Sequence, residues 1–180
     1  MKYKLYISIL CASMLFFACK KESLQTYLVE TQEKKGFSHI TIPASILQLG
    51  AANITEAEKE AYESINKVNI TGLLAENAAE GQYETEKQKL KSIFKDSDYK
   101  TLMNFKNNGN SATLYYTGST DAIDEIIVFG YGEKLGVGVA RVLGDNMNPN
   151  AIIKMLRKTQ LDTDNVNLNQ FKMIFGDKMK

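Results

Sequence analysis

The tetrapeptide Asn107-Asn108-Gly109-Asn110 constrains the fold more than any other stretch of this chain. It lies between two β-rich segments, residues 102–106 and 111–117. Asn-Gly pairs adopt the backbone angles of a tight turn readily, so the pattern predicts an antiparallel hairpin.

A second hairpin is predicted from residues 125–132 and 135–143, with its turn centred on Glu133-Lys134. That register places an aromatic or larger residue opposite each glycine of the facing strand, as when a ring shields a strand glycine. A Val at position 138 would then crowd Phe129. The predicted facing pairs are Tyr131 with Gly136, Phe129 with Gly138, Ile127 with Ala140, Gly130 with Val137, and Gly132 with Leu135.

The same glycines, Gly130-Tyr131-Gly132 and Gly136-Val137-Gly138, invite comparison with a dinucleotide-binding loop. That loop needs Gly-x-Gly-x-x-Gly between a strand and a helix. Here the third glycine comes one residue late and a strand follows. We therefore expect these glycines to pack in the sheet and to bind no nucleotide.

Apolar spacing predicts the remaining elements. A helix begins at Leu24, is capped by Ser23 and ends before Gly36, and a strand of residues 37–42 ends at Pro43. Residues 55–58 have the form of a capping box, which opens a helix with Ala61, Tyr62 and Ile65 inward. Further predicted elements are a helical turn at 44–49, an alternating strand at 68–74, a charged helix at 82–95, and helices after Pro149 and at 168–175.

This order predicts an α+β fold. A mostly antiparallel sheet is built from the two C-terminal hairpins and the earlier strands, with helices mainly on one face. We expect residues 24–180 to form a single domain.

The N-terminus has the features of a lipoprotein signal. Lys2 and Lys4 precede an apolar run from Leu5 to Ala18, which is too short for a membrane helix, and Ala18 precedes Cys19. The place three residues before the cysteine, usually Leu, holds Phe16. We expect residues 1–18 to be a signal peptide, and residues 19–23 to be a lipidated cysteine, carrying palmitate-type chains, with a short tether. An ordinary cleaved signal is the alternative.

Cleavage before Cys19 removes Lys2 and Lys4, which leaves 20 basic against 21 acidic residues and a net charge of −1. A near-neutral domain has no broad field for nucleic acid. Beyond Cys19 there is no further cysteine, so a thiol nucleophile and a cysteine metal site are excluded. Lys20 and Lys21 stand where some surface-exported lipoproteins carry an acidic run. We therefore expect a periplasm-facing protein, anchored to the Gram-negative envelope through Cys19.

Several segments share a pattern with a known family: the signal, the helix leading into Phe37-Ser-His-Ile-Thr-Ile, and the segment Tyr99-Lys-Thr-Leu-Met-Asn-Phe-Lys. The strand Ile126-Ile-Val-Phe, the glycine-containing hairpin and the helix after Pro149 also fit. In these features the chain is similar to a family of small Bacteroidota lipoproteins, domain of unknown function 4252. Members are often encoded beside extracytoplasmic sigma-factor genes, which implies a role in envelope regulation. The family has no established activity, so no functional residue carries over.

Three side chains are candidates for ligand binding. His39 is the only histidine and stands on a predicted strand, where a structural role is the common one. Arg141 could receive an anion, or could pair across the sheet with a carboxylate such as Glu125. Tyr115 and Tyr116 point to opposite faces of one strand, so on a one-sided sheet only one is core and the other, with Tyr116 as the candidate, could contact a partner.

Carboxylates are the other candidates, since pairs of them perform acid–base or metal chemistry. They flank predicted caps and turns, and none has calcium-loop spacing, so we expect no metal, no cofactor and no catalytic residue. The acidic residues in question are Asp96, Asp98, Asp121, Asp124 and Glu125.

Two hypotheses remain open. The favoured one is a non-catalytic envelope lipoprotein that binds a protein or small ligand, as a binding or signalling-associated module. The alternative is an envelope hydrolase with a carboxylate-based site. A meeting of His39, Arg141 and the acidic residues in one pocket would favour the enzyme.

Overall fold

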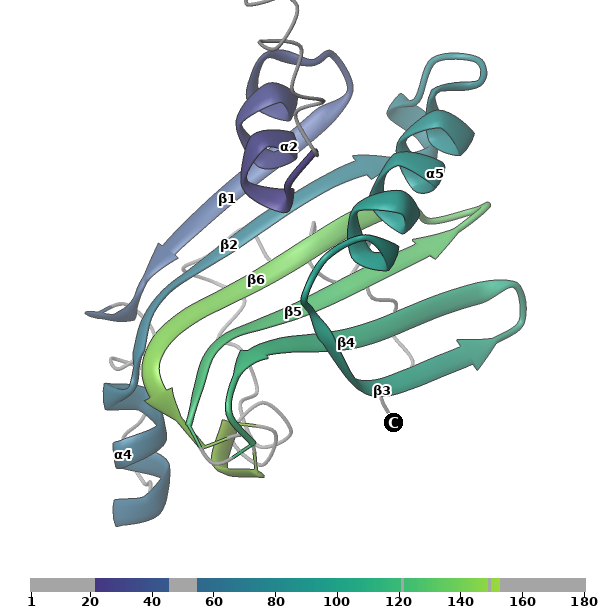
Figure 1. Ribbon diagram of the computed structural model, residues 1–180. Coiled ribbons are helices and arrows are strands. Elements are labelled where there is room, and N and C mark those ends of the chain that lie inside the picture. The colour runs from purple at the N-terminus through teal and green to yellow at the C-terminus, as the bar shows by residue number, and fades with distance from the viewer. Residues whose placement is uncertain (1–21, 46–54, 121, 149, 153–180) are drawn as a thin grey trace, which may run out of the picture.

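A six-stranded antiparallel sheet forms the centre of the computed structural model, which describes residues 22–45, 55–120, 122–148 and 150–152 (Figure 1). The strand order is β1-β2-β6-β5-β4-β3. This architecture confirms the predicted α+β fold, with two hairpins forming four of the strands. The strands are β1 (Phe37–Pro43), β2 (Ile65–Leu74), β3 (Lys100–Asn107), β4 (Asn110–Gly118), β5 (Ile123–Gly132) and β6 (Gly136–Met147).

Helices α2 (Leu24–Glu30) and α5 (Gln82–Lys95) lie on the same face of the sheet, which we call the helical face (Figure 1). Ser23 caps α2 as predicted, since its Oγ accepts from the N–H of Thr26 at 3.1 Å. A 3-10 turn (Thr31–Glu33) continues α2 towards Gly36. The helices bury an apolar core against β2, β5 and β6, made of Leu24, Tyr27, Leu28, Leu73, Leu90, Ile93, Phe94, Ile127, Phe129, Val137 and Val139.

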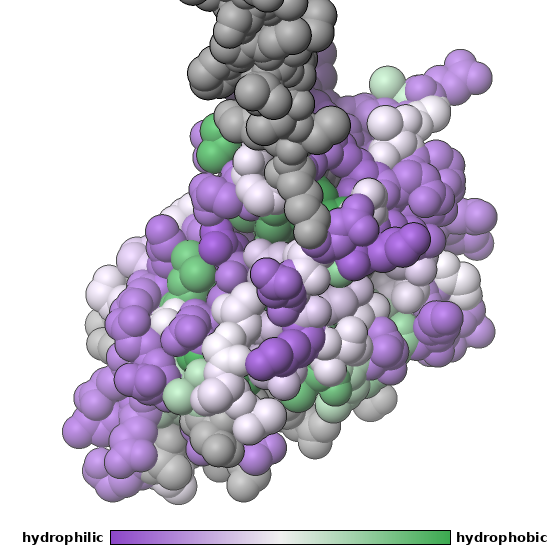
Figure 2. All heavy atoms as spheres, viewed as in Figure 1, coloured by the Kyte–Doolittle hydropathy of each residue, from purple (hydrophilic) through white to green (hydrophobic). Residues whose placement is uncertain are grey.

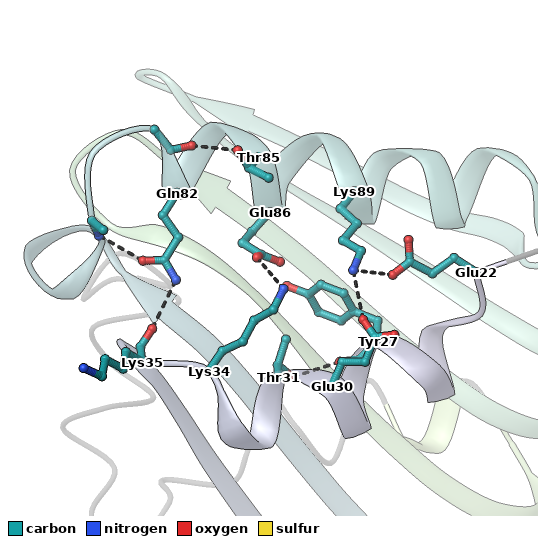
Figure 3. Close-up of polar contacts among 12 residues, drawn as sticks. Glu22, Tyr27, Glu30, Thr31, Lys34, Lys35, Gln82, Thr85, Glu86 and Lys89 are labelled. Atoms are coloured by element: carbon teal, nitrogen blue, oxygen red, sulfur yellow. Dashed lines mark hydrogen bonds and ion pairs between the residues drawn. The ribbon is translucent and has the colours of Figure 1, made fainter.

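Polar contacts join α2 to α5 (Figure 3). Lys34 donates to Oε1 of Glu86 at 2.9 Å, and Glu86 is only 3% exposed. Lys89 of α5 forms ion pairs with Glu22 and Glu30, at 2.5 and 3.0 Å. These contacts fix α2 above the strands, because they bind both of its ends to the longer helix.

The opposite face of the sheet is also buried in part, so the sheet is not one-sided and both tyrosines of β4 can pack in the core. Tyr116, 9% exposed, packs there with Ile126 and Val142. Its neighbour Tyr115 lies on the helical face, stacked on Phe94 at 4.4 Å. Helix α4 (Glu56–Glu63) and Ile152 pack against one end of the opposite face. Tyr116 is therefore a core residue and not a partner contact.

The β5–β6 hairpin has a register one residue away from the predicted one. Its loop is Glu133-Lys134-Leu135, so Gly132 pairs with Gly136, Tyr131 with Val137, and Gly130 with Gly138. A register changed by one residue places each predicted facing partner on the other face of the sheet. Phe129 thus faces Val139, and Gly138 lies on the opposite face between Gly72 and Gly130.

Most other predicted elements are confirmed. Residues 82–95 form α5, and the turn at Asn108-Gly109 joins β3 to β4. Ile65 was expected in a helix but begins β2. The strand predicted at 68–74 is buried on both faces towards its end, so it does not alternate. The helical turn at 44–49 is described only at residues 44 and 45. The helix after Pro149 is described only at residues 150–152, and the one predicted at 168–175 lies outside the described residues.

Candidate functional site

Arg141 occupies the middle of β6 on the helical face, beyond the part that α5 covers. Its Nε donates to Oε1 of Glu125 on β5, which is the pairing expected from the sequence. Its Nη1 donates to Oε1 of Gln25 on α2 at 2.6 Å. The guanidinium therefore links the start of α2 to two strands, and its charge is balanced by a mostly buried carboxylate.

His39 lies on the edge strand β1 and connects the end of α2 to the sheet. Its Nε2 is 2.9 Å from the carbonyl oxygen of Thr31, and its Nδ1 is 3.1 Å from Oγ1 of Thr71. A carbonyl can only accept, so Nε2 carries a proton, and in the neutral ring the Thr71 hydroxyl donates to Nδ1. Both ring nitrogens thus have structural partners, although the side chain remains exposed.

The structure brings His39 and Arg141 into one cleft, of about 390 Å³, between α2 and strands β1, β2 and β6. Thr41, Asn69 and Arg141 form one row across these strands on its floor. Val29 of α2, 54% exposed, lies at its rim. The lining residues are Gln25, Leu28, Val29, Gln32, His39, Ile40, Thr41, Lys67, Asn69, Ile70, Thr71, Arg141 and Leu143.

The cleft offers amide, hydroxyl and cationic groups above a partly apolar wall. Lys67 supplies positive charge, Arg141 supplies N–H donors while its charge is balanced by Glu125, and the lining described contains no carboxylate. Thr41 donates to Oδ1 of Asn69 at 3.2 Å, so the amide nitrogen of Asn69 is not used in that contact. Such a set of groups can hydrogen-bond a polar ligand and balance a negative charge on it.

The other sequence candidates lie apart from this cleft. Asp96 and Asp98 line a second cavity of about 340 Å³, with Glu22, at the start of α2 and the end of α5. Glu125 is used by Arg141, and Asp124 is exposed. Asp121 and the lipidation candidate Cys19 lie outside the described residues. The acidic residues therefore do not meet His39 within the described part of the chain.

The polar contacts between α2 and α5 hold α2 in place as one wall of the cleft (Figure 3). They run from Lys34 to Glu86 and from Lys89 to Glu22 and Glu30. Burial raises the pKa of Tyr27 far above its usual value, and the negative charge of Glu86 raises it further. Tyr27 Oη and Glu86 Oε2 have no hydrogen-bond partner of good geometry among the residues described. Burying these two oxygens without a hydrogen bond costs free energy of folding, and the packing of the two helices must offset that cost.

Sequence reasoning missed Gln25, Gln32, Asn69 and Thr71 as cleft residues. Gln25 and Gln32 are seven residues apart, two helical turns, so they could have been placed on one side of the helix. Asn69 and Thr71 alternate with the apolar Ile70, which signals a polar strand face. Nothing local indicated that the two segments meet.

None of the described helices is long and apolar enough to cross a membrane. The profile of the family described as "Domain of unknown function (DUF4252)" matches residues 27–155, which is more than half of the chain. No curated protein and no solved structure matches the sequence.

Proposed function

The chain belongs to the DUF4252 family, and we propose that it is a lipid-anchored envelope protein that binds a polar ligand, or a polar segment of a partner, in the cleft beside α2. The observation that carries this proposal is the convergence of Arg141, Asn69, Gln25 and Gln32 on one cleft that lacks a carboxylate in its described lining. These groups suit recognition by hydrogen bonds and charge. The domain faces the periplasm and takes part in no chemistry of its own.

A hydrolase is the weaker candidate because the groups it needs are already engaged. A general base requires a nitrogen or oxygen within reach of the proton that it removes. Both ring nitrogens of His39 contact Thr31 and Thr71, and the carboxylate of Glu125 contacts Arg141. The cleft therefore favours holding a ligand over activating a nucleophile.

The anchor is tested by replacing Cys19 with Ser. The motivating observation is Ala18-Cys19 after the apolar run. Fatty-acid labelling and detergent-phase partitioning of the protein should both be lost. Labelling that persists in this variant refutes the anchor. Protease treatment of intact cells checks sidedness: the domain should survive with the periplasmic controls, and selective digestion would contradict a periplasmic orientation.

The cleft is tested by photo-crosslinking in living cells. Benzoylphenylalanine is introduced at Gln32, which lines the cleft, and at Gln88, an exposed control position on α5. An adduct is expected from position 32 alone, and Thr41→Trp, which fills the cleft, should remove it. Thr85→Trp, at an exposed position of α5, is the matched control. Equal adducts from both positions, or an adduct insensitive to Thr41→Trp, would overturn the assignment.

A further inference from the structure

The free edge of the sheet at β3 is separate from the cleft. In the described part of the chain β3 is the last strand of the sheet and pairs only with β4. Most of its residues are exposed, and Phe105 is 51% exposed. An open edge carries unpaired backbone N–H and C=O groups that can hydrogen-bond an added strand.

The hairpin turn shows which backbone groups point outward. Asn108 and Gly109 have φ angles of 48° and 82°, the positive pair of a type I′ turn. In such a hairpin Asn107 and Asn110 hydrogen-bond to each other, and the pattern alternates along the strands. The N–H and C=O groups of Lys106 and Asn104 therefore face away from β4. The irregular register between Thr101 and Met103 limits the regular edge to residues 103–107.

Positive charge gathers beside this edge on the helical face. Lys106, Ser111 and Tyr131 form one row across β3, β4 and β5. From α5, Nζ of Lys91 lies 4.7 Å from the centre of the Tyr131 ring, and Nζ of Lys87 lies 5.8 Å from it. Figure 2 shows hydrophilic residues gathered over α5 and the turn between β3 and β4.

The positive charge of the lysines near Tyr131 is only partly balanced by carboxylates. Lys87 forms an ion pair with Glu84, whereas neither Lys91 nor Lys106 forms one within the residues described. The pKa of Tyr131 is lowered by a hydrogen bond with Ser111 and by the charges of Lys91 and Lys106, despite partial burial. A phenol responds in this way to a positive field.

We propose that the β3 edge is a docking surface for an extended acidic polypeptide segment from another protein, which adds to the sheet as a seventh strand. The outward groups of Asn104 and Lys106 pair with its backbone, its carboxylates contact Lys106, and Lys91, above β5, adds to the positive field. Phe105, on the other side of β3, supplies an apolar contact. A second copy of this chain fits poorly, because β3 carries Lys100 and Lys106 but no carboxylate, so its own edge offers no negative charge to the lysines here.

The test uses the full lipoprotein in detergent and two labelled seven-residue peptides, an alternating Glu-Val repeat and the same repeat with Gln for Glu. Fluorescence anisotropy should show tighter binding of the acidic peptide. The double change Lys91→Gln and Lys106→Gln should weaken that binding about three- to tenfold, the effect of removing two exposed charges. Lys59→Gln, on α4, is the control and should change nothing.

Asn104→Pro tests the edge itself, because it removes an outward N–H without taking a hydrogen bond from the β3–β4 ladder. Asn104→Ala is its matched control, since both variants lose the contact with Thr113. Binding should fall in the proline variant alone, at unchanged melting temperature. Equal binding of the Gln peptide, equal loss in Lys59→Gln, or equal binding by both Asn104 variants overturns the proposal. So does lysine-dependent binding to phosphatidylglycerol vesicles without peptide binding, or self-association through β3.

Discussion

The Nε–H of Arg141 donates to Oε1 of Glu125, so the principal cation of the cleft is held by a carboxylate of its own sheet. The side chains are only 15% and 10% exposed, respectively. A mostly buried ion pair fixes geometry, while its net contribution to stability is small because both charges lose their hydration. Its role here is to hold the guanidinium between α2 and the floor of the cleft.

Breaking this pair should be costly. Glu125→Gln leaves the charge of Arg141 mostly buried without a counter-charge, and should lower the free energy of unfolding by roughly 3 kcal/mol. Glu30→Gln removes a carboxylate that is 48% exposed in its pair with Lys89 and should cost less than about 1 kcal/mol. Urea denaturation of both variants checks the difference. Similar losses would mean that the Arg141 pair is not a special constraint.

Stability should fall at alkaline pH partly because of Tyr27. Its folded-state pKa is raised above the usual value near 10, so the unfolded chain releases this proton at a lower pH than the folded chain does. The stabilisation is therefore present below pH 10 and is lost as the pH rises further, at up to about 1.4 kcal/mol per pH unit.

The variant Tyr27→Phe isolates this effect from the titration of the lysines. Its free energy of unfolding should decline less steeply above pH 10 than that of the unchanged protein. Chemical denaturation at pH 8, 10 and 11 gives the comparison. If the free energies of unfolding of the two proteins decline in parallel with pH, the hydroxyl of Tyr27 is not shielded in the folded state.

Gly136 is predicted to be the glycine least tolerant of substitution in the β5–β6 hairpin. Its φ is +110°, and an added Cβ would lie 2.0 Å from the carbonyl oxygen of Leu73. Gly81, with φ +73°, has nothing within 4 Å of such an atom. Gly81→Ala should cost about 1 kcal/mol from backbone strain alone, and Gly136→Ala clearly more. Equal melting temperatures would contradict the close approach.

Local sequence chemistry was sufficient for much of the fold. The Ser23 cap, the Asn108-Gly109 turn and the apolar spacing of residues 82–95 each act through near neighbours, so the elements that they define could be predicted. The second hairpin shows the limit. Its strands were predicted, but a loop of three residues in place of two shifted the register, and every facing pair changed with it.

The site was predictable only in parts. The pairing of Arg141 with Glu125 followed from two strands of one hairpin, which the sequence identifies. The meeting of His39 with Arg141 depends on β2 lying between β1 and β6, a long-range pairing without a local signal. Glu86 belongs to the helix at residues 82–95 that is predicted as charged. It lies four residues before Leu90 on the buried side, and its partner Lys34 comes from a distant segment.

Amide chemical-shift mapping tests most directly whether the cleft beside α2 holds a ligand. The isotope-labelled full-length protein in detergent is titrated with a fractionated extract of membranes from its source cells. We predict saturable shifts at the amides of His39, Thr71 and Arg141, and their loss in Thr41→Trp but not in Thr85→Trp. Saturable shifts confined to other surfaces, or cleft shifts unaffected by Thr41→Trp, would contradict the assignment of this cleft as the binding site.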